Sequence, residues 1–254
     1  MTGPDEGQKC PEPYCSYGLA ERLLFMKEQG IPGKRASGRS AAEMVEDGMV
    51  IGLGTGSTIL FAMERLAERI EKGLAITGIP TSYQAEIRAR ALGIPLTTLQ
   101  DHPHPDAAID GADLVDSGKR LIKGRGGALT REKCVAHAAG RLLIVVDQKK
   151  CVRELRGVVP VEVLPFAVLP VLRSIQDLGA SPVLREGTAK DGPVITDNGN
   201  FILDCTFPEI PDPGTLETTL DAIPGVVSSG LFTRLTGKTE VIVGKADGSG
   251  VFTL

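Results

Sequence analysis

The order of strand-like and helix-like segments constrains the fold of this chain most. From residue 34 to residue 147, short apolar segments alternate with segments of helical periodicity, and several helical segments end on glycine. This alternation predicts a parallel sheet, because a parallel neighbour is reached only by a long crossover connection. The strand-like segments are 49–54, 74–80, 106–110 and 141–147, and the helical ones are 35–48, 57–73, 83–93 and 131–140.

The pattern changes after about residue 156. Six further segments follow the order β-α-β-β-α-β, with Asn198-Gly199 at the expected tip of a hairpin, and this order predicts a ferredoxin-like unit. We therefore expect an α/β fold with a Rossmann-like parallel sheet domain and a second, smaller ferredoxin-like α+β domain. The expected boundaries are an N-terminal extension at 1–33, the first domain at 34–155 with two strands returning from 235–254, and the second domain at 156–234.

Composition excludes several classes of protein. Hydrophobic residues make up 42% and the formal charge is −4, so a globular protein is expected and a general nucleic-acid surface is not. No apolar run is long enough to span a membrane, and the five cysteines contain no Cys-x-x-Cys pair, which favours a reduced, cytoplasmic protein. Cys10 with Cys15, and His102 with His104, supply too few ligands to predict a metal site.

The segment GLGTGST, residues 52–58, lies between a strand and a helix. Glycines open the backbone to an anion, the helix start favours negative charge, and Ser57 and Thr58 add hydroxyl donors. Ser57 stands where a dinucleotide motif has its third glycine, and no acidic residue ends the next strand. A phosphate site is therefore favoured over NAD, with a simple turn capped by serine or threonine as the alternative.

Two more segments end predicted strands with charged residues. DGAD places Asp110 and Asp113 after one strand, and VVDQKK places Lys149 and Lys150 after another. In open α/β sheets, ligands bind at this edge. Taken alone, each segment is equally consistent with a polar turn or with solvated lysines.

The segment KGRGGALTREK, residues 123–133, combines a lysine, three glycines and a glutamate. Thr130 is the expected N-cap of a helix, which places Glu132 in the first turn, where the helix dipole favours its ionised form. Glu132 is then a candidate base facing Lys123, although a first-turn glutamate can also serve only to stabilise its helix.

Together these segments predict one edge that holds a phosphate cradle, two aspartates, a lysine with glycine N–H groups, and a glutamate. This set suits the transfer of a proton between adjacent carbons of a sugar phosphate, without metal or cofactor. A base moves the proton while a cation and backbone N–H groups stabilise the enediolate oxygen.

GLGTGST, DGAD, KGRGGALTREK and GPVITDNGNFILD…IPGVVSSGLF resemble, in order and spacing, ribose-5-phosphate isomerase of the A type, and PTSYQAE resembles its archaeal members. The resemblance implies interconversion of D-ribose 5-phosphate and D-ribulose 5-phosphate in the non-oxidative pentose phosphate pathway, by a homodimer or homotetramer without cofactor. It implies catalytic roles for Glu132, Lys123, Asp110 and Asp113. It implies substrate contacts by Thr55, Gly56, Ser57, Thr58, Asp110, Gly111, Ala112, Asp113, Lys123, Gly124, Arg125, Gly126 and Lys150.

Leu114 and Gly127 depart from the family pattern, which usually has glutamate and alanine there, and nothing in the family explains residues 1–33. Glucosamine-phosphate deaminases and CoA transferases are rival enzymes of similar fold, which the spacing of KGRGGALTREK disfavours. A sugar-phosphate sensor is a second rival. It would carry a DNA-binding segment that the extension is too short to supply, and it would not need Glu132.

Overall fold

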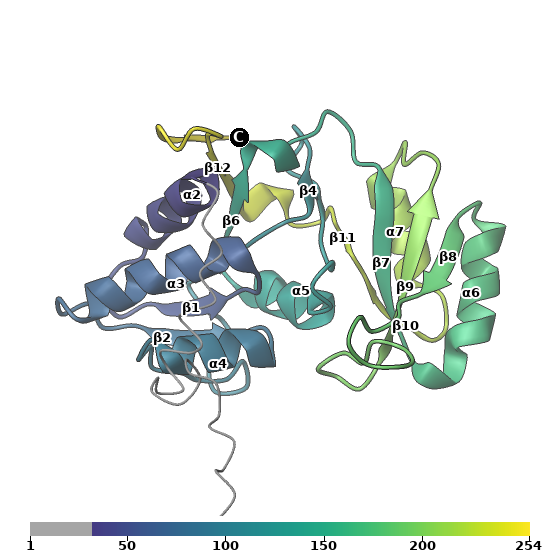
Figure 1. Ribbon diagram of the computed structural model, residues 1–254, viewed down its shortest axis with the longest axis horizontal. Coiled ribbons are helices and arrows are strands. Elements are labelled where there is room, and N and C mark those ends of the chain that lie inside the picture. Colours follow the sequence, from purple (N-terminus) through teal and green to yellow (C-terminus); the bar gives the residue numbers. More distant parts are fainter. Residues whose placement is uncertain (1–31) are drawn as a thin grey trace, which may run out of the picture.

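The computed structural model describes residues 32–254, and the largest of its three sheets has six strands in the order β13-β12-β6-β3-β1-β2. All neighbouring strands in this sheet run parallel except β13, which pairs antiparallel with β12. The two C-terminal strands therefore return to the first sheet, as the sequence predicts (Figure 1). The elements up to residue 150 are α2 (Pro32–Glu43), β1 (Val50–Leu53), α3 (Ser57–Ile70), β2 (Thr77–Pro80), α4 (Tyr83–Ala91), β3 (Ala107–Asp110), β4 (Leu114–Val115), β5 (Leu121–Ile122), α5 (Leu129–Ala138), β6 (Arg141–Asp147) and η1 (Gln148–Lys150).

Side chains of the central strands alternate between two cores. Leu143 and Val145 of β6 pack with α2 and α3 on one face, whereas Leu142 and Ile144 pack with α5 on the other. This alternation follows from the two-residue period of a strand, and burial on both faces explains why β6 is apolar from Leu142 to Val146.

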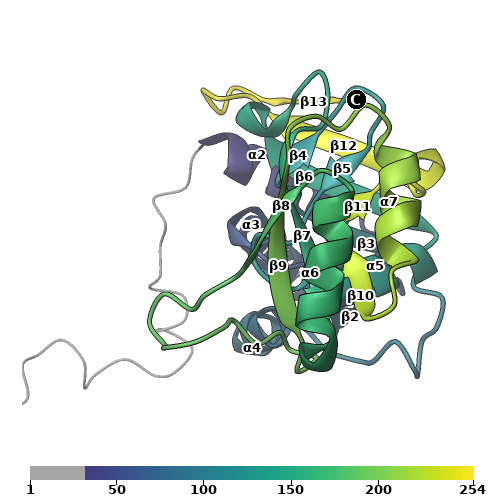
Figure 2. The same cartoon turned by 90° about the vertical axis from the view of Figure 1, so that its right-hand side faces the viewer.

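A four-stranded antiparallel sheet follows, in the order β10-β7-β9-β8. With the chain order β-α-β-β-α-β, this arrangement is ferredoxin-like, as the sequence predicts. Figure 1 shows it to the right of the first sheet, with α5 between them, and Figure 2 shows α6 and α7 side by side. The remaining elements are β7 (Gly157–Val163), η2 (Pro165–Ala167), α6 (Val168–Asp177), β8 (Ser181–Leu184), β9 (Phe201–Phe207), α7 (Pro213–Asp221), β10 (Val226–Ser229), β11 (Leu231–Phe232), η3 (Thr236–Lys238), β12 (Thr239–Gly244) and β13 (Val251–Thr253).

The segment 226–232, expected as one strand, is divided at Gly230. Its first part is β10, and its second part, β11, joins β5 and β4 in a small antiparallel sheet. Gly230 lies too close to the Lys123 carbonyl oxygen for a side chain, since a Cβ there would be 2.3 Å from that oxygen. The small sheet thus ties the segment before Lys123 to the C-terminal part of the chain.

Other expectations have mixed outcomes. The turn at Asn198-Gly199 is present, with the Gly199 N–H donating to the Thr196 carbonyl at 2.9 Å, but only its second arm is a strand. The first helix begins at Pro32 and ends at Glu43, earlier than the predicted 35–48. Cys10 and Cys15 lie outside the described residues. Across residues 32–254, no helix is long and apolar enough to cross a membrane.

Candidate active site

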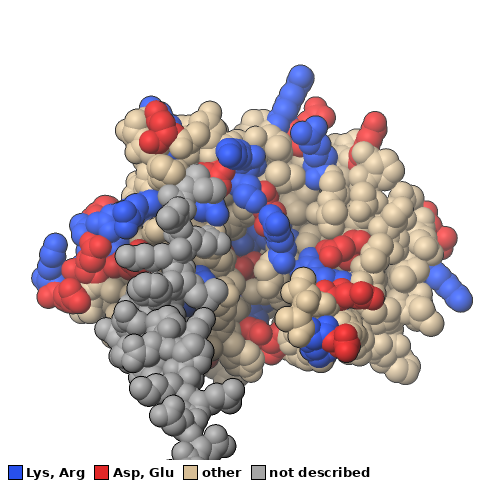
Figure 3. All heavy atoms as spheres, in the orientation of Figure 1, with Lys and Arg blue, Asp and Glu red and all other residues tan. Residues whose placement is uncertain are grey.

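A cavity of about 500 Å³ opens where β1, β3 and β6 end. These three strands are neighbours in the sheet, so the segments that follow them meet at one edge. On the face shown in Figure 3, lysine and arginine side chains gather around a hollow between the two parts of the molecule. All but one of the predicted site residues line the cavity. These are Thr55, Gly56, Ser57, Thr58, Gly111, Ala112, Asp113, Lys123, Gly124, Arg125, Gly126, Glu132 and Lys150.

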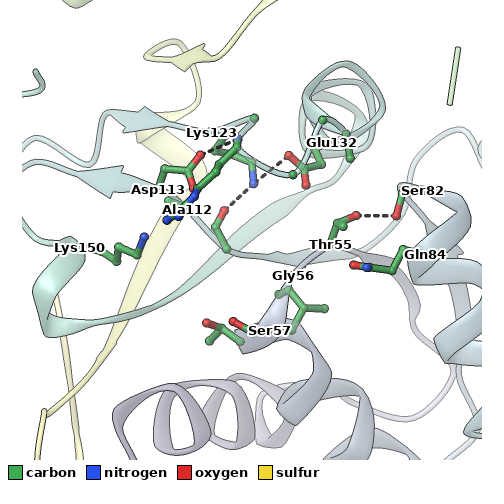
Figure 4. A pocket seen from close by; sticks show the side chains of 18 of the residues that line it. Thr55, Gly56, Ser57, Ser82, Gln84, Ala112, Asp113, Lys123, Glu132 and Lys150 are labelled. Carbon is green, nitrogen blue, oxygen red and sulfur yellow. Dashed lines mark hydrogen bonds and ion pairs between the residues drawn. The ribbon is translucent and has the colours of Figure 1, made fainter. Parts of the chain in front are cut away.

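Lys123 and Glu132 of the cavity wall form a buried trio with Asp110. The Lys123 Nζ lies 3.0 Å from Asp110 Oδ2 and 3.2 Å from Glu132 Oε2, and it donates to the Gly111 carbonyl oxygen at 2.5 Å. Each of the three side chains is at most 6% exposed. Figure 4 shows Lys123 and Glu132 directed toward each other, with Ser57 and Lys150 farther away in the same pocket.

Asp110 is the predicted site residue that does not line the cavity. It lies behind Lys123, where its carboxylate accepts the N–H of Gly111 at 2.7 Å and also the N–H of Thr55. Gly54 makes this position possible, since a Cβ at residue 54 would lie 2.1 Å from Asp110 Oδ1. Asp110 therefore reaches the cavity only through Lys123 and Glu132, and direct contact with a ligand, as the sequence suggested, is not what this geometry favours.

Two carboxylates share one ammonium group in this trio. Burial, followed by the negative charge of Asp110, raises the pKa of Glu132 to about 8, and the opposing influence of Lys123 is smaller. Burial lowers the pKa of Lys123, but Asp110 and Glu132 together outweigh it, so this pKa is raised and the ammonium stays charged. Burial raises the pKa of Asp110 as well, and Lys123 together with the N–H groups of Gly111 and Thr55 opposes that rise.

The raised pKa of Glu132 is opposite in direction to the effect expected from the helix dipole. The sequence placed it in the first turn of a helix, which is confirmed, and predicted that the helix dipole would keep it ionised. A surface helix dipole is worth less than about 1 kcal/mol, whereas removing a carboxylate from water costs several times more. Burial therefore has a larger effect on the pKa of Glu132 than the helix dipole has.

A group of cationic and hydroxyl side chains forms another part of the cavity. Helix α3 begins at Ser57, and its N-cap is Gly56 at φ 122, a conformation that favours glycine. The hydroxyl of Ser57 does not cap the helix. Instead it accepts a hydrogen bond from the Lys34 Nζ at 2.8 Å. Lys150, at the end of η1, lines the same cavity, so two cations and a helix start are available for an anion.

The glycine loop, residues 124–127, connects β5 with α5. The Arg125 N–H donates to Asp113 Oδ2 at 2.9 Å, and Arg185 of the antiparallel sheet donates to the carbonyl oxygens of Gly124 and Arg125 at 2.9 and 3.1 Å. Backbone groups of this loop therefore have fixed directions. Gly127 of this loop also lines the cavity, whereas Leu114 packs into the core of the antiparallel sheet and does not line the cavity.

Thr130 is not the N-cap that the sequence predicted. Helix α5 begins at Leu129 with Ala128 as its N-cap, so Thr130 lies inside the first turn. Its hydroxyl donates to Glu162 Oε2 of β7 at 2.5 Å. A tertiary acceptor has replaced the local backbone bond that the pattern suggested.

Four polar or charged cavity residues were not predicted. Lys34 precedes any recognisable motif, and Ser82 and Gln84 lie in PTSYQAE, for which no function was predicted. Asp197 belongs to TDNGN, which was read only as a turn. Over the residues that the structure describes, no group of three or more His, Cys, Asp or Glu side chains is arranged to hold a metal ion.

The chain is similar in sequence to known proteins over most of its length. Residues 77–248 match the family model described as ribose 5-phosphate isomerase A (phosphoriboisomerase A). A ribose-5-phosphate isomerase A of Methanoregula boonei is 62% identical over 87% of this chain and 93% of that protein. One of Methanosarcina acetivorans is 51% identical over 86% of this chain and 92% of that protein.

Solved structures agree with the sequence matches. Ribose 5-phosphate isomerase A from Methanocaldococcus jannaschii has a TM-score of 0.82 at 44% identity, over 87% of this chain and 97% of the other. A D-ribose-5-phosphate isomerase in complex with phospho-erythronic acid has a TM-score of 0.83 at 44% identity, over 87% of this chain and 96% of the other.

Proposed function

The chain belongs to the ribose 5-phosphate isomerase A family, and on that premise we propose that it interconverts D-ribose 5-phosphate and D-ribulose 5-phosphate through an enediolate. The reaction needs no metal or cofactor in this proposal and serves the non-oxidative pentose phosphate pathway. The observation that carries it is the buried trio, which sets a glutamate of raised pKa 3.2 Å from a buried ammonium in the wall of a cavity of about 500 Å³.

The proposed chemistry moves one proton between two carbons. The ionised Glu132 takes the proton from C2 of the open-chain aldose, the electrons move onto the carbonyl oxygen at C1, and Glu132 then returns the proton to C1. Lys123 and the N–H groups of the glycine loop stabilise the enediolate oxygens. A proton also moves from the C2 hydroxyl to the C1 oxygen, and Asp113, which lines the cavity, is the proposed relay.

The phosphate of the substrate would bind near the start of α3. Lys34, Ser57, Thr58 and Lys150 line this part of the cavity, and a helix N-terminus favours an anion. The complex of a relative with phospho-erythronic acid supports a sugar phosphate as the ligand. That compound carries a phosphate at one end and a carboxylate at the other, and the two carboxylate oxygens imitate the paired oxygens of an enediolate.

Catalysis and binding can be separated by replacing Glu132. We expect purified protein to convert ribose 5-phosphate to ribulose 5-phosphate with or without a chelator. Glu132→Gln should lower kcat by about 10² to 10⁴, because a general base is lost, while calorimetry still detects substrate binding. Glu154→Gln is the matched control, because the Glu154 side chain is 80% exposed and does not line the cavity.

A sensor of related fold remains the alternative function. Tight binding of ribose 5-phosphate by the wild-type protein, with no turnover and no exchange of the C2 proton with deuterated water, would favour the sensor. Near-normal turnover by Glu132→Gln would instead show that another group is the base.

Two organisational features also remain proposals. We propose that residues 34–155 and 235–254 form the catalytic domain, with 156–234 as the second domain, and that copies of the chain associate as a homodimer or homotetramer. Phe166 is 99% exposed and Leu169 is 66% exposed, which makes their surface a candidate contact between copies. Light scattering of Phe166→Glu, compared with wild type, tests that contact.

A further inference from the structure

Glu162, next to the C-terminal end of β7, is a fully buried carboxylate outside the cavity. Its Oε2 accepts the Thr130 hydroxyl at 2.5 Å. Its Oε1 accepts three donors, which are the Thr196 hydroxyl at 2.9 Å and the side-chain amides of Asn198 at 3.0 Å and Asn200 at 2.8 Å. All four donors are neutral, and within residues 32–254 the interactions of this carboxylate are with hydroxyl and amide groups.

Such an arrangement is expensive for a residue that only fills space. A buried carboxylate without a cation loses its hydration and recovers only part of that free energy through neutral hydrogen bonds. An apolar side chain of similar size would avoid this loss if packing were the sole requirement. The four donors come from two segments of the chain, and Glu162 joins these two segments.

One oxygen of Glu162 holds the start of helix α5. Thr130 lies two residues before Glu132, in the same first turn, so the Thr130 bond fixes the part of the helix that carries the proposed base. The contact joins a helix that follows the glycine loop to a strand of the other sheet. It acts on the direction of Glu132 through the backbone between the two residues.

The other oxygen holds the turn 196–200. This turn carries Asp197, which lines the cavity and accepts the Tyr83 N–H at 2.7 Å. Arg131, next to Glu132, donates to Asn198 Oδ1 and to the Asp197 carbonyl oxygen, both at 2.7 Å. The turn and the helix start are therefore joined at the surface by Arg131 and in the interior by Glu162.

We propose that Glu162 is a positioning residue that fixes Glu132 and the Asp197 turn relative to each other, and so sets the distance across the cavity between the base and the rim. Its Oε2 holds the helix start that carries Glu132, and its Oε1 holds the turn that carries Asp197. This inference rests on the proposed isomerase function, since it assigns Glu162 a role in the placement of the base.

The two oxygens can be tested separately. Glu162→Gln keeps one acceptor oxygen for the turn, and its amide can donate to Thr130, whose hydroxyl can accept as well as donate. We expect kcat within about threefold of wild type for Glu162→Gln and at least about 10-fold lower for Glu162→Leu, since small displacements of a catalytic group can lower rates by up to about 100-fold.

Thr130→Val tests the helix side without removing the carboxylate. It should lower kcat by about 10-fold and leave KM within about twofold, because the turn stays attached to Glu162. Thr219→Val is the matched control, since the Thr219 hydroxyl is exposed and donates only to the Thr215 carbonyl of its own helix. Melting temperatures measured on the same samples identify any variant that fails to fold. If a Glu162 variant fails to fold, the kcat of Thr130→Val tests the proposal.

The outcomes separate this inference from the proposed function. A wild-type protein without isomerase activity would overturn the function itself. An active wild type whose Thr130→Val variant matches Thr219→Val in kcat would overturn the positioning role alone. A folded Glu162→Gln variant as slow as Glu162→Leu would also overturn it, because a side chain that can keep these hydrogen bonds would then fail to keep kcat.

Discussion

Replacing Asp110 with asparagine should move the pH dependence of catalysis without removing the base. Asp110 and Glu132 both contact the Lys123 Nζ, so their contacting oxygens are at most about 6 Å apart. Two unit charges at that distance interact by about 3 kcal/mol at an effective dielectric constant of about 20, which corresponds to about 2 in pKa. Burial and, after it, the charge of Asp110 raise the pKa of Glu132 to about 8, so removing that charge in Asp110→Asn should lower this pKa to about 6.

The assay is the acidic limb of kcat/KM for ribose 5-phosphate, which reports ionisations of the free enzyme and free substrate. In wild type the limb should fall near pH 8, and in Asp110→Asn it should move toward pH 6, where the substrate phosphate itself titrates at about 6. A carbon-13 titration of the Glu132 carboxyl in the free enzyme avoids that overlap. A limb that stays near pH 8 in the folded variant would show that burial alone raises this pKa and would refute the shared-ammonium reasoning.

Four further results are expected. Between about pH 4.5 and 8, the folded state holds a proton on Glu132 that the unfolded state has lost. The free energy of unfolding of the wild type should therefore fall by about 1.4 kcal/mol from this group for each unit of rising pH, and Glu132→Gln should remove that fall in denaturant titrations at several pH values. Equal slopes in both proteins would contradict the raised pKa. Lys150→Ala should raise KM by about 10-fold or more with kcat nearly unchanged, whereas Lys149→Ala, whose side chain does not line the cavity, should resemble wild type. Gly54→Ala should lower kcat by at least about 10-fold, because its Cβ would lie 2.1 Å from a carboxylate oxygen of the buried trio; Gly237→Ala, where a Cβ meets nothing within 4 Å, is the control. Turnover should survive dialysis against a chelator, and loss of activity that a divalent metal restores would contradict the proposed chemistry.

The sequence predicted the convergence of the site well, because that convergence follows from parallel strands. Once β1, β3 and β6 are recognised as parallel, the residues after them must meet at one edge. The pairing of Lys123 with Glu132 followed from their closeness in the chain. These inferences needed only periodicity, the spacing of glycines and the chemistry of the side chains.

The depth and the cross-sheet contacts of the site could not be predicted in the same way. That Asp110 lies behind Lys123 depends on the absence of a side chain at Gly54, which no local pattern reveals. The N-cap expected at Thr130 was wrong because an acceptor 32 residues away in sequence competes for its hydroxyl. Such outcomes are decided by tertiary contacts, which override local propensity.

The pairing of β5 with β11 also bears on when the site comes into being during synthesis. Leu121 and Ile122, just before the proposed electrophile, pair with Phe232 and Leu231, and the Lys123 N–H donates to the Gly230 carbonyl at 2.8 Å. Contacts between residues more than a hundred positions apart form late, because closing so long a loop is slow. A nascent chain that ends before β11 can build much of the first sheet, yet the N–H of its Lys123 lacks the Gly230 acceptor and β5 lacks β11 as a partner strand. The contacts that hold the backbone at Lys123 are thus complete only after residue 232 has been synthesised.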